Sequence, residues 1–166
     1  MTQINPSFNS VGIVGLGLIG GSIGLDLQSL GLNVKGLVHT PSTIAKAEKR
    51  KLAQLISTDP NILKDCDLII LALPLADLLN PAKELVEALP KNAIVTDVGS
   101  VKDPIQKLWE NLHPNFVPSH PMAGTNAAGV DAGKSGLFNQ RYWIATPNTK
   151  TNLNALKTVQ ELAKCL

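Results

Sequence analysis

The sequence has little cysteine, few aromatic side chains and little net charge, and each shortage excludes a class of protein. Two cysteines, Cys66 and Cys165, in 166 residues are too few for a disulfide scaffold and too far apart for a metal-binding pair. Aromatic residues make up 4% of the chain, which argues against a surface that stacks nucleic-acid bases. A formal net charge of +2 provides neither a basic surface for nucleic acid nor a polybasic segment for a membrane.

Long apolar runs are absent as well. The run at residues 68–73 stops at Pro74, whereas a membrane-spanning helix needs about 20 apolar residues. The polar residues 1–10 lack the charged and apolar regions of a secretion signal. The acids Asp97, Asp103 and Asp131 do not have the spacing of metal ligands. These features predict a cytoplasmic protein whose partners include no metal, membrane or nucleic acid.

Aliphatic residues, glycine and proline are plentiful. Hydrophobic residues make up 44% of the chain, with 13 glycines and 11 prolines, a composition that favours a layered aliphatic core with tight connections. Hydrophobic patterning predicts strands at residues 11–14, 33–38, 55–57, 67–73, 93–97, 116–119 and 142–146, and helices at 18–30, 42–52, 77–89, 101–112 and 152–166. Several strands are apolar on both faces, which is typical of a parallel sheet covered on both sides. The predicted fold is therefore α/β, with a doubly wound, mostly parallel sheet of the Rossmann type.

The predicted dinucleotide-binding domain covers residues 11–166 and follows a short N-terminal extension at residues 1–10. Its last helix has no glycine or proline after it and leaves Leu162 and Leu166 at helical spacing. We interpret this ending as favouring a piece of a longer protein over a natural terminus.

A glycine motif follows the first predicted strand and opens the first predicted helix. In this G-x-G-x-x-G pattern, the first glycine makes the turn, the second lets a pyrophosphate approach, and the third lets the helix lie close to the sheet. Free N–H groups at the helix start bind the phosphates. The pattern predicts a nucleotide-binding segment made of Gly15, Leu16, Gly17, Leu18, Ile19 and Gly20.

The end of the second predicted strand indicates which nucleotide binds. NAD sites usually place an acidic residue about 20 residues after the glycines, where it binds the ribose 2′-hydroxyl. No acidic residue lies between Asp26 and Glu48. Imidazole and hydroxyl groups stand there instead, on His39, Thr40, Ser42 and Thr43, and basic residues follow at Lys46, Lys49 and Arg50. We therefore predict a 2′-phosphate site and NADP as cofactor, and a helix cap by Thr40 or Ser42 is compatible with it.

Candidate reactive residues follow three predicted strands, where doubly wound sheets place their chemistry. They lie at Pro74, in the segment 97–102 and in the segment 119–125. His120 directly follows a strand and precedes a turn of small residues. Taken alone, such a histidine is more often structural than catalytic.

Simpler roles are open for the neighbouring polar residues. Ser100 could be the N-cap of the helix predicted from residue 101. Lys102 fits a solvated lysine in the first turn or a partner for a carboxylate. His113 lies at a predicted helix end, where we expect a surface or capping role.

Three segments together resemble the prephenate/arogenate dehydrogenase family: G-L-G-L-I-G-G-S at residues 15–22, D-V-G-S-V-K at 97–102 and S-H-P-M-A-G-T at 119–125. The resemblance covers essentially the whole chain in order and spacing. It implies the cofactor domain of an oxidoreductase of tyrosine biosynthesis, which converts arogenate to tyrosine or prephenate to 4-hydroxyphenylpyruvate. Family members continue into a helical domain that forms a dimer, so the resemblance also implies a homodimer in the complete protein.

The resemblance further implies roles for single residues. His120 would accept the proton of the ring 4-hydroxyl as hydride leaves the same carbon, a task suited to histidine because free imidazole is mainly neutral at pH 7. Ser100 matches a serine that hydrogen-bonds near the substrate hydroxyl and the histidine, and Thr125 matches a threonine on the substrate side. Residues 39–43 resemble those of NADP-preferring, cyanobacterial-type members.

One residue departs from the pattern of the family, and two other functions remain open. Asn126 stands where many prephenate-specific members have an acid, which favours arogenate. The arginine that binds the substrate carboxylate lies in the family's helical domain, so we expect this chain alone to bind cofactor with little or no turnover.

A 3-hydroxyacid dehydrogenase-like enzyme is one alternative function, against which the H-P-M-A-G block argues. A non-catalytic NAD(P)-sensing domain is the other.

Overall fold

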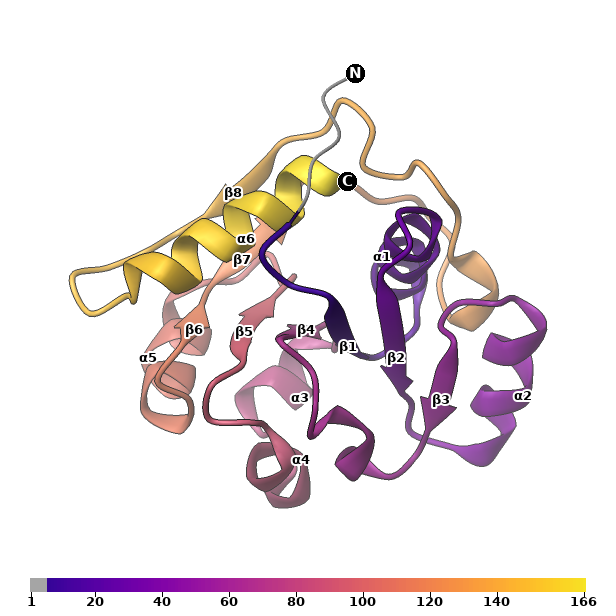
Figure 1. Ribbon diagram of the computed structural model, residues 1–166, viewed down its shortest axis with the longest axis horizontal. Helices are drawn as coiled ribbons and strands as arrows, with labels where there is room; N and C mark the ends of the chain where they lie inside the picture. Colours follow the sequence, from indigo (N-terminus) through magenta and orange to yellow (C-terminus); the bar gives the residue numbers. More distant parts are fainter. Residues whose placement is uncertain (1–5) are drawn as a thin grey trace.

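A parallel sheet organises the chain (Figure 1), and the computed structural model describes residues 6–166. Its strands are β1 (Ser10–Val14), β2 (Asn33–Leu37), β3 (Leu55–Ser57), β4 (Leu68–Leu71), β5 (Ile94–Asp97) and β6 (Phe116–Val117). They pair in the order β3-β2-β1-β4-β5-β6, and every pair is parallel. The chain thus begins in the middle of the sheet and winds outward in both directions. The predicted doubly wound α/β fold is confirmed.

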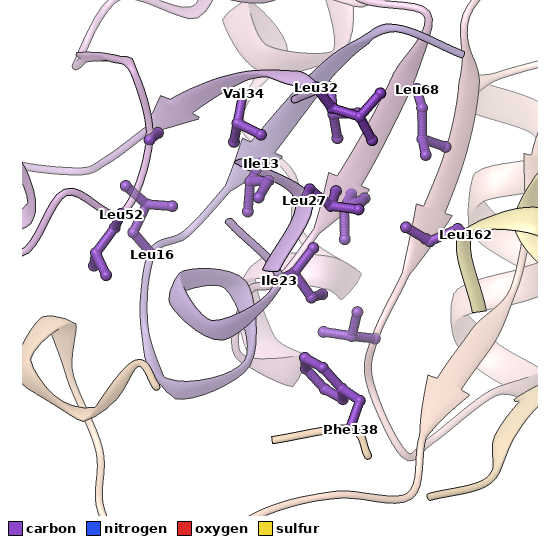
Figure 2. Packing of buried hydrophobic residues seen from close by; sticks show 14 of the residues in the cluster. Ile13, Leu16, Ile23, Leu27, Leu32, Val34, Leu52, Leu68, Phe138 and Leu162 are labelled. Carbon is purple, nitrogen blue, oxygen red and sulfur yellow. The ribbon is translucent and has the colours of Figure 1, made fainter. Parts of the chain in front are cut away.

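Helices cover both faces of the sheet. They are α1 (Leu18–Ser29), α2 (Pro41–Lys49), α3 (Leu75–Leu79), α4 (Lys83–Ala88), α5 (Asp103–Leu112) and α6 (Leu153–Cys165), with short 3-10 turns at η1 (Pro60–Leu63) and η2 (Val130–Ala132). Alternate residues of β4 enter two separate cores: Leu68 and Ile70 on the α1 and α6 side, shown in Figure 2, and Ile69 and Leu71 on the α3 to α5 side. This burial on both faces explains why the strand reads as a continuous apolar run.

Proline interrupts two elements that the hydrophobic pattern predicted as continuous. Residues 77–89 form two short helices, α3 and α4, because Pro81 has no N–H and disfavours helical geometry at Asn80, which has φ −134° and ψ 63°. Pro118 likewise divides the strand predicted at 116–119. After it, β7 (Ser119–Pro121) leaves the main sheet and pairs antiparallel with β8 (Trp143–Ala145). Pro118 therefore places His120 in a different sheet from β5 and β6.

Two other helices differ from their predicted bounds. The helix predicted at 42–52 ends at Lys49 because Lys51 adopts a left-handed backbone with φ 54°, which lets Leu52 turn back into the core. The helix predicted from residue 101 begins at Asp103, and its N-cap is Lys102. Ser100 is exposed and lies before this cap. The N-cap role considered for Ser100 is wrong.

Residues 6–9 pack against the domain and are continuous with it. Phe8 is 3% exposed and belongs to the α1-side core. The backbone N–H of Ser7 donates to Glu161 of α6 at 2.9 Å, and that of Asn9 donates to Asp67 at 3.0 Å. The remaining part of the predicted extension, residues 1–5, lies outside the described residues.

Candidate functional site

The glycine segment makes the turn from β1 into α1 in the middle of the sheet. Gly15 has φ +92°, and its N–H donates to the carbonyl of Leu37 at 2.9 Å. A Cβ atom on Gly15 would lie 2.4 Å from the carbonyl oxygen of Ala72. Both the backbone angle and the close approach therefore require glycine at this turn.

The two other motif glycines have contrasting surroundings. A Cβ atom on Gly20 would lie 1.9 Å from the carbonyl oxygen of Gly15, so this glycine lets α1 lie against the strand. A Cβ atom on Gly17 would meet nothing within 4 Å. Gly17 is also the N-cap of α1, and no side chain caps the helix there. The first turn of α1 therefore presents backbone N–H groups beside open space, the arrangement that phosphate needs.

The remaining residues of the segment hold the loop in place. Leu16 is 3% exposed and belongs to the α1-side core. A Cβ atom on Gly36 of β2 would lie 2.5 Å from the Leu16 side chain. Leu16 can thus serve a nucleotide only through its backbone, while Leu18 and Ile19 are half-buried at the helix start.

A cluster of hydroxyl groups surrounds the start of α2, just beyond β2. Thr40 is the N-cap and its Oγ1 accepts from the N–H of Thr43 at 3.3 Å, so the predicted cap is confirmed for Thr40. The same oxygen lies 3.0 Å from the Ser42 hydroxyl and 2.9 Å from the Thr43 hydroxyl. His39 and Ser42 are exposed. The cluster offers an oxyanion several donors and no acidic side chain.

The three basic residues near α2 divide into two groups. Lys46 and Lys49 are exposed in the last turn of the helix. Arg50 instead donates to the carbonyl of Asp131, at 2.8 Å, and to the carbonyl of Gly133. The guanidinium of Arg50 therefore fastens the loop around η2 with two of its N–H groups.

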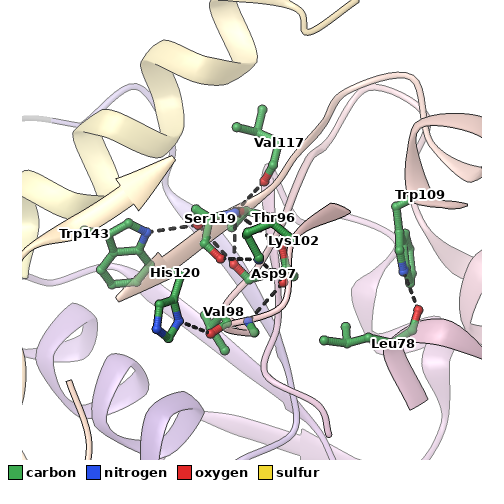
Figure 3. Close-up of polar contacts among 11 residues, drawn as sticks. Leu78, Thr96, Asp97, Val98, Lys102, Trp109, Val117, Ser119, His120 and Trp143 are labelled. Atoms are coloured by element: carbon green, nitrogen blue, oxygen red, sulfur yellow. Dashed lines mark hydrogen bonds and ion pairs between the residues drawn. The ribbon is translucent and has the colours of Figure 1, made fainter. Parts of the chain in front are cut away.

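His120 lies on β7 with its ring orientation fixed by a backbone carbonyl. Its Nδ1 atom is 2.9 Å from the carbonyl oxygen of Val98, the residue that follows β5 (Figure 3). Because a carbonyl oxygen can only accept, Nδ1 carries the hydrogen. Nε2 is then left with a lone pair, the form of the ring that can accept a proton.

The other predicted reactive residues lie at the ends of the strands without direct contact to this ring. Ser100 and Thr125 are exposed, and the Thr125 hydroxyl accepts from the N–H of Ala127 at 3.1 Å. Within residues 6–166, no hydrogen bond joins Ser100 or Thr125 to His120. Pro74 is exposed after β4 and is the N-cap of α3.

A buried polar network lies behind His120, and its members Thr96, Asp97, Ser119 and Trp143 are not among the predicted site residues. Asp97, which is 0% exposed, accepts hydrogen bonds from the Lys102 ammonium and from the backbone N–H of Gly99. The Ser119 hydroxyl lies 2.8 Å from that of Thr96, donates to the carbonyl of Asp97 at 3.0 Å and accepts from the Trp143 indole at 2.9 Å. The acidic end of an otherwise apolar strand was the available signal, because a buried carboxylate needs a partner.

Burial shifts the pKa values of both members of the ion pair. Loss of hydration raises the pKa of the Asp97 carboxyl and lowers the pKa of the Lys102 ammonium, while the attraction between the two groups opposes both shifts. Of the two roles considered for Lys102, partner of a carboxylate is the one observed.

His113 occupies a very different environment from His120. It is 4% exposed, its Nε2 atom bonds the carbonyl of Pro90 at 3.0 Å, and its Nδ1 atom accepts from the N–H of Asn115 at 3.3 Å. Burial lowers the pKa of His113. Of the two roles expected for His113, capping is the one observed, because His113 is the C-cap of α5 and its backbone N–H donates to the carbonyl of Trp109. Its burial excludes the surface role.

Within residues 6–166, no group of His, Cys, Asp and Glu side chains could hold a metal ion. In the same range, no helix has the length and apolar character needed to cross a membrane.

The helix start without a side-chain cap and the open space at Gly17, directly after the first strand of a doubly wound sheet, are features of dinucleotide-binding domains. Within that class, residues 23–166 match the family model described as "Prephenate dehydrogenase, nucleotide-binding domain". The chain belongs to the prephenate dehydrogenase family, as the resemblance of its motifs implied.

Individual relatives agree with this assignment. A cyclohexadienyl dehydrogenase of Zymomonas mobilis is 31% identical over 159 residues, covering 93% of this chain and 54% of its own length. A crystal structure of prephenate dehydrogenase from A. aeolicus, in complex with hydroxyphenyl propionate and NAD+, has a TM-score of 0.88 and 32% identity over 96% of this chain and 57% of that one. The crystal structure of Synechocystis arogenate dehydrogenase has a TM-score of 0.83 and 34% identity over 93% and 56%. The chain spans about half the length of the curated relatives that it matches.

Proposed function

We propose that this chain is the NADP-binding part of an arogenate dehydrogenase, which forms tyrosine by oxidative decarboxylation, and that prephenate is the less favoured substrate. The observation that carries the proposal is the pairing of open space at Gly17 with a histidine whose Nε2 atom has no hydrogen-bond partner among residues 6–166. Membership of the family supplies the reaction class. In the complete protein we expect residues 11–166 to act as the dinucleotide-binding domain, in a cytoplasmic homodimer.

The residues of the glycine segment fit a nicotinamide dinucleotide. The N–H groups of Leu18, Ile19 and Gly20 would bind its pyrophosphate at the start of α1. Leu16 would contribute its backbone, and Pro74 would line the site beyond β4. When bound, this cofactor supplies the hydride acceptor of the reaction.

The preference for NADP is proposed from the chemistry of the β2 end. His39, Thr40, Ser42 and Thr43 would surround the 2′-phosphate, and Lys46 and Lys49 add positive charge nearby. An acidic residue at this position would repel that phosphate, and none is present. The NAD+ in the A. aeolicus structure makes NAD the cofactor against which this preference is tested.

The proposed mechanism assigns His120 as the base. Its Nε2 atom accepts the proton of the substrate's 4-hydroxyl while the hydrogen on the same carbon leaves as hydride. The bond to the ring carboxylate then breaks and CO2 leaves. The electrons of that bond complete the aromatic ring, and the 4-oxygen takes the proton back from His120 to give the phenol. Ser100 would bind the 4-hydroxyl, and Thr125 would contact the substrate from the loop after β7.

The preference for arogenate rests on the residue after Thr125. Asn126 is exposed and uncharged where many prephenate-specific relatives are expected to have an acid. The carboxylate side of the substrate requires residues outside this chain, so the substrate preference belongs to the complete protein.

Calorimetric titration of the chain with NADP and, separately, with NAD tests the cofactor assignment. We expect NADP to bind at least about fivefold more tightly, since one added charge contact in water contributes about 1 kcal/mol or more. Tighter binding of NAD would contradict the 2′-phosphate site but keep the glycine segment. Absence of binding by either nucleotide would contradict the phosphate site at α1 as well.

A further inference from the structure

A buried ion pair lies directly behind the hydrogen bond that orients His120. The Lys102 side chain is 15% exposed and that of Asp97 is 0% exposed. The ammonium of Lys102 donates to Oδ2 of Asp97 and, at 2.6 Å, to the carbonyl oxygen of Ser119. Figure 3 shows Lys102 between the end of β5 and the start of β7.

Lys102 joins Asp97 to Ser119. Each of these two residues is next in the chain to a member of the hydrogen bond between His120 and Val98. Asp97 precedes Val98, whose carbonyl oxygen accepts from His120, and Ser119 precedes His120. Two more bonds join the same pair of residues: the Ser119 N–H donates to Asp97 Oδ1 at 3.3 Å, and the Ser119 hydroxyl donates to the Asp97 carbonyl at 3.0 Å.

Strand pairing ends just before the two residues of the His120 hydrogen bond. β5 pairs with β6 as far as Thr96 and Val117, whereas β7 belongs to the two-stranded sheet and shares no ladder of hydrogen bonds with β5. Beyond Thr96 and Val117, the contacts of Asp97, Lys102 and Ser119 hold Val98 beside His120.

Stability alone is a weak reason for such an ion pair. Burying both charges removes their hydration, and well-packed apolar side chains often stabilise a core as much or more. Helix α5, which follows Lys102, carries an ordinary surface pair, Lys107 with Asp103 at 2.8 Å, whose side chains are 72% and 76% exposed. The chain thus offers a buried lysine–aspartate pair at Lys102 and a solvated one at Lys107.

We propose that Lys102 is a positioning residue for His120. Through Asp97 and Ser119, it holds the Val98 carbonyl against Nδ1 of His120, so that Nε2 remains the proton-accepting atom of the ring. The role of Nε2 as proton acceptor rests on the proposed function. The position of the ring hydrogen is independent of that function and can be measured on this chain.

The test is the tautomer of each neutral imidazole, read from long-range proton–nitrogen NMR correlations of the folded chain at about pH 8. The chain has three histidines, and His113 provides an internal reference because its contacts require the hydrogen on Nε2. In the wild type we expect His120 to carry the hydrogen on Nδ1. In Lys102→Met we expect the ratio of the Nδ1–H to the Nε2–H form of His120 to fall about tenfold, the effect of losing one ordinary hydrogen bond.

Two further variants separate positioning from folding. Lys107→Met, the matched control, should leave the His120 tautomer ratio unchanged. Lys102→Arg should keep the ratio near that of the wild type, because a guanidinium can donate to both Asp97 and Ser119. If Lys102→Met does not fold because Asp97 is left unpaired, the double variant Asp97→Asn with Lys102→Met removes both charges and should show the same tenfold fall.

The outcomes distinguish the two proposals. A folded Lys102→Met or double variant that keeps the wild-type tautomer ratio would overturn the positioning role, even with a lowered melting temperature. A wild-type His120 that carries its hydrogen on Nε2 would instead overturn the assignment of Nε2 as the base, and the positioning role with it.

Discussion

The glycine turn between β1 and α1 and the His120 corner beside β5 are built in opposite ways. The glycine turn is one contiguous segment, and its function depends on residues that have no side chain. A Cβ atom would collide with the backbone at Gly20 and would fill open space at Gly17. The His120 corner is assembled from β5, β7, β8 and the start of α5, and it depends on buried polar side chains. The comparison teaches that a binding surface for phosphate can be local, whereas orienting a base requires contacts across the fold.

The largest expected effect is on the chemistry of the His120 corner. In the complete enzyme, His120→Asn should lower kcat by about 10²–10⁴-fold, the usual contribution of a positioned base. The affinity for NADP should stay within about twofold, because the phosphate site lies on α1. Steady-state kinetics with arogenate and calorimetry with NADP measure the two quantities. Turnover close to wild type would contradict the role of His120.

The next largest effect distinguishes Gly20 from Gly17. Gly20→Ala should lower the free energy of unfolding by about 3 kcal/mol, because its Cβ would lie 1.9 Å from a backbone oxygen and the strand or helix must shift. Gly17→Ala should lower the free energy of unfolding by about 1 kcal/mol or less, because it changes only the N-cap of α1. Its methyl group should nevertheless weaken NADP binding about tenfold or more by occupying the space beside α1.

Urea unfolding and calorimetry of both variants check this pair of expectations. Equal stability of Gly20→Ala and Gly17→Ala would contradict the difference between a packing glycine and a binding glycine. Unchanged NADP affinity in Gly17→Ala would place the pyrophosphate elsewhere.

A smaller effect concerns the end of β2. Ser42→Asp adds a carboxylate beside the hydroxyl cluster and should weaken NADP binding roughly tenfold through repulsion of the 2′-phosphate, with little change for NAD. Asn154→Asp adds the same charge at the equivalent second position of α6 and serves as the matched control. An equal loss of affinity for NADP and NAD in Ser42→Asp would argue against a phosphate at this cluster.

The smallest expected effect is a pH dependence of stability that His113 causes. Burial lowers the pKa of His113 in the folded protein, so the unfolded chain binds the proton more readily. The stabilising contribution of the neutral ring is complete above the unfolded pKa of about 6.5 and is lost as the pH falls below it. Urea unfolding of wild type and His113→Gln between about pH 8 and pH 5 should give curves that converge as the pH falls. Parallel curves would contradict this origin.

The sequence predicted most of the fold and the glycine half of the site. The apolar run of β4 and the glycines at 15, 17 and 20 are local signals whose physical meaning does not depend on distant residues. The hydrophobic periodicity continues across Pro81 and Pro118, so periodicity by itself predicts uninterrupted elements where the prolines break them. The buried role of His113 could not be predicted, because its burial comes from the carbonyl of Pro90 on a different segment.

By itself, the sequence determined the doubly wound sheet, the position of the nucleotide turn and the family, since each depends on patterns within short segments. The tertiary structure alone decided which Lys102 contact forms, which ring nitrogen of His120 carries the hydrogen, and that Arg50 fastens a loop. The physical reason is that a hydrogen bond requires donor and acceptor within about 3 Å, and in these cases the partners are brought together only by the packing of elements far apart in the chain.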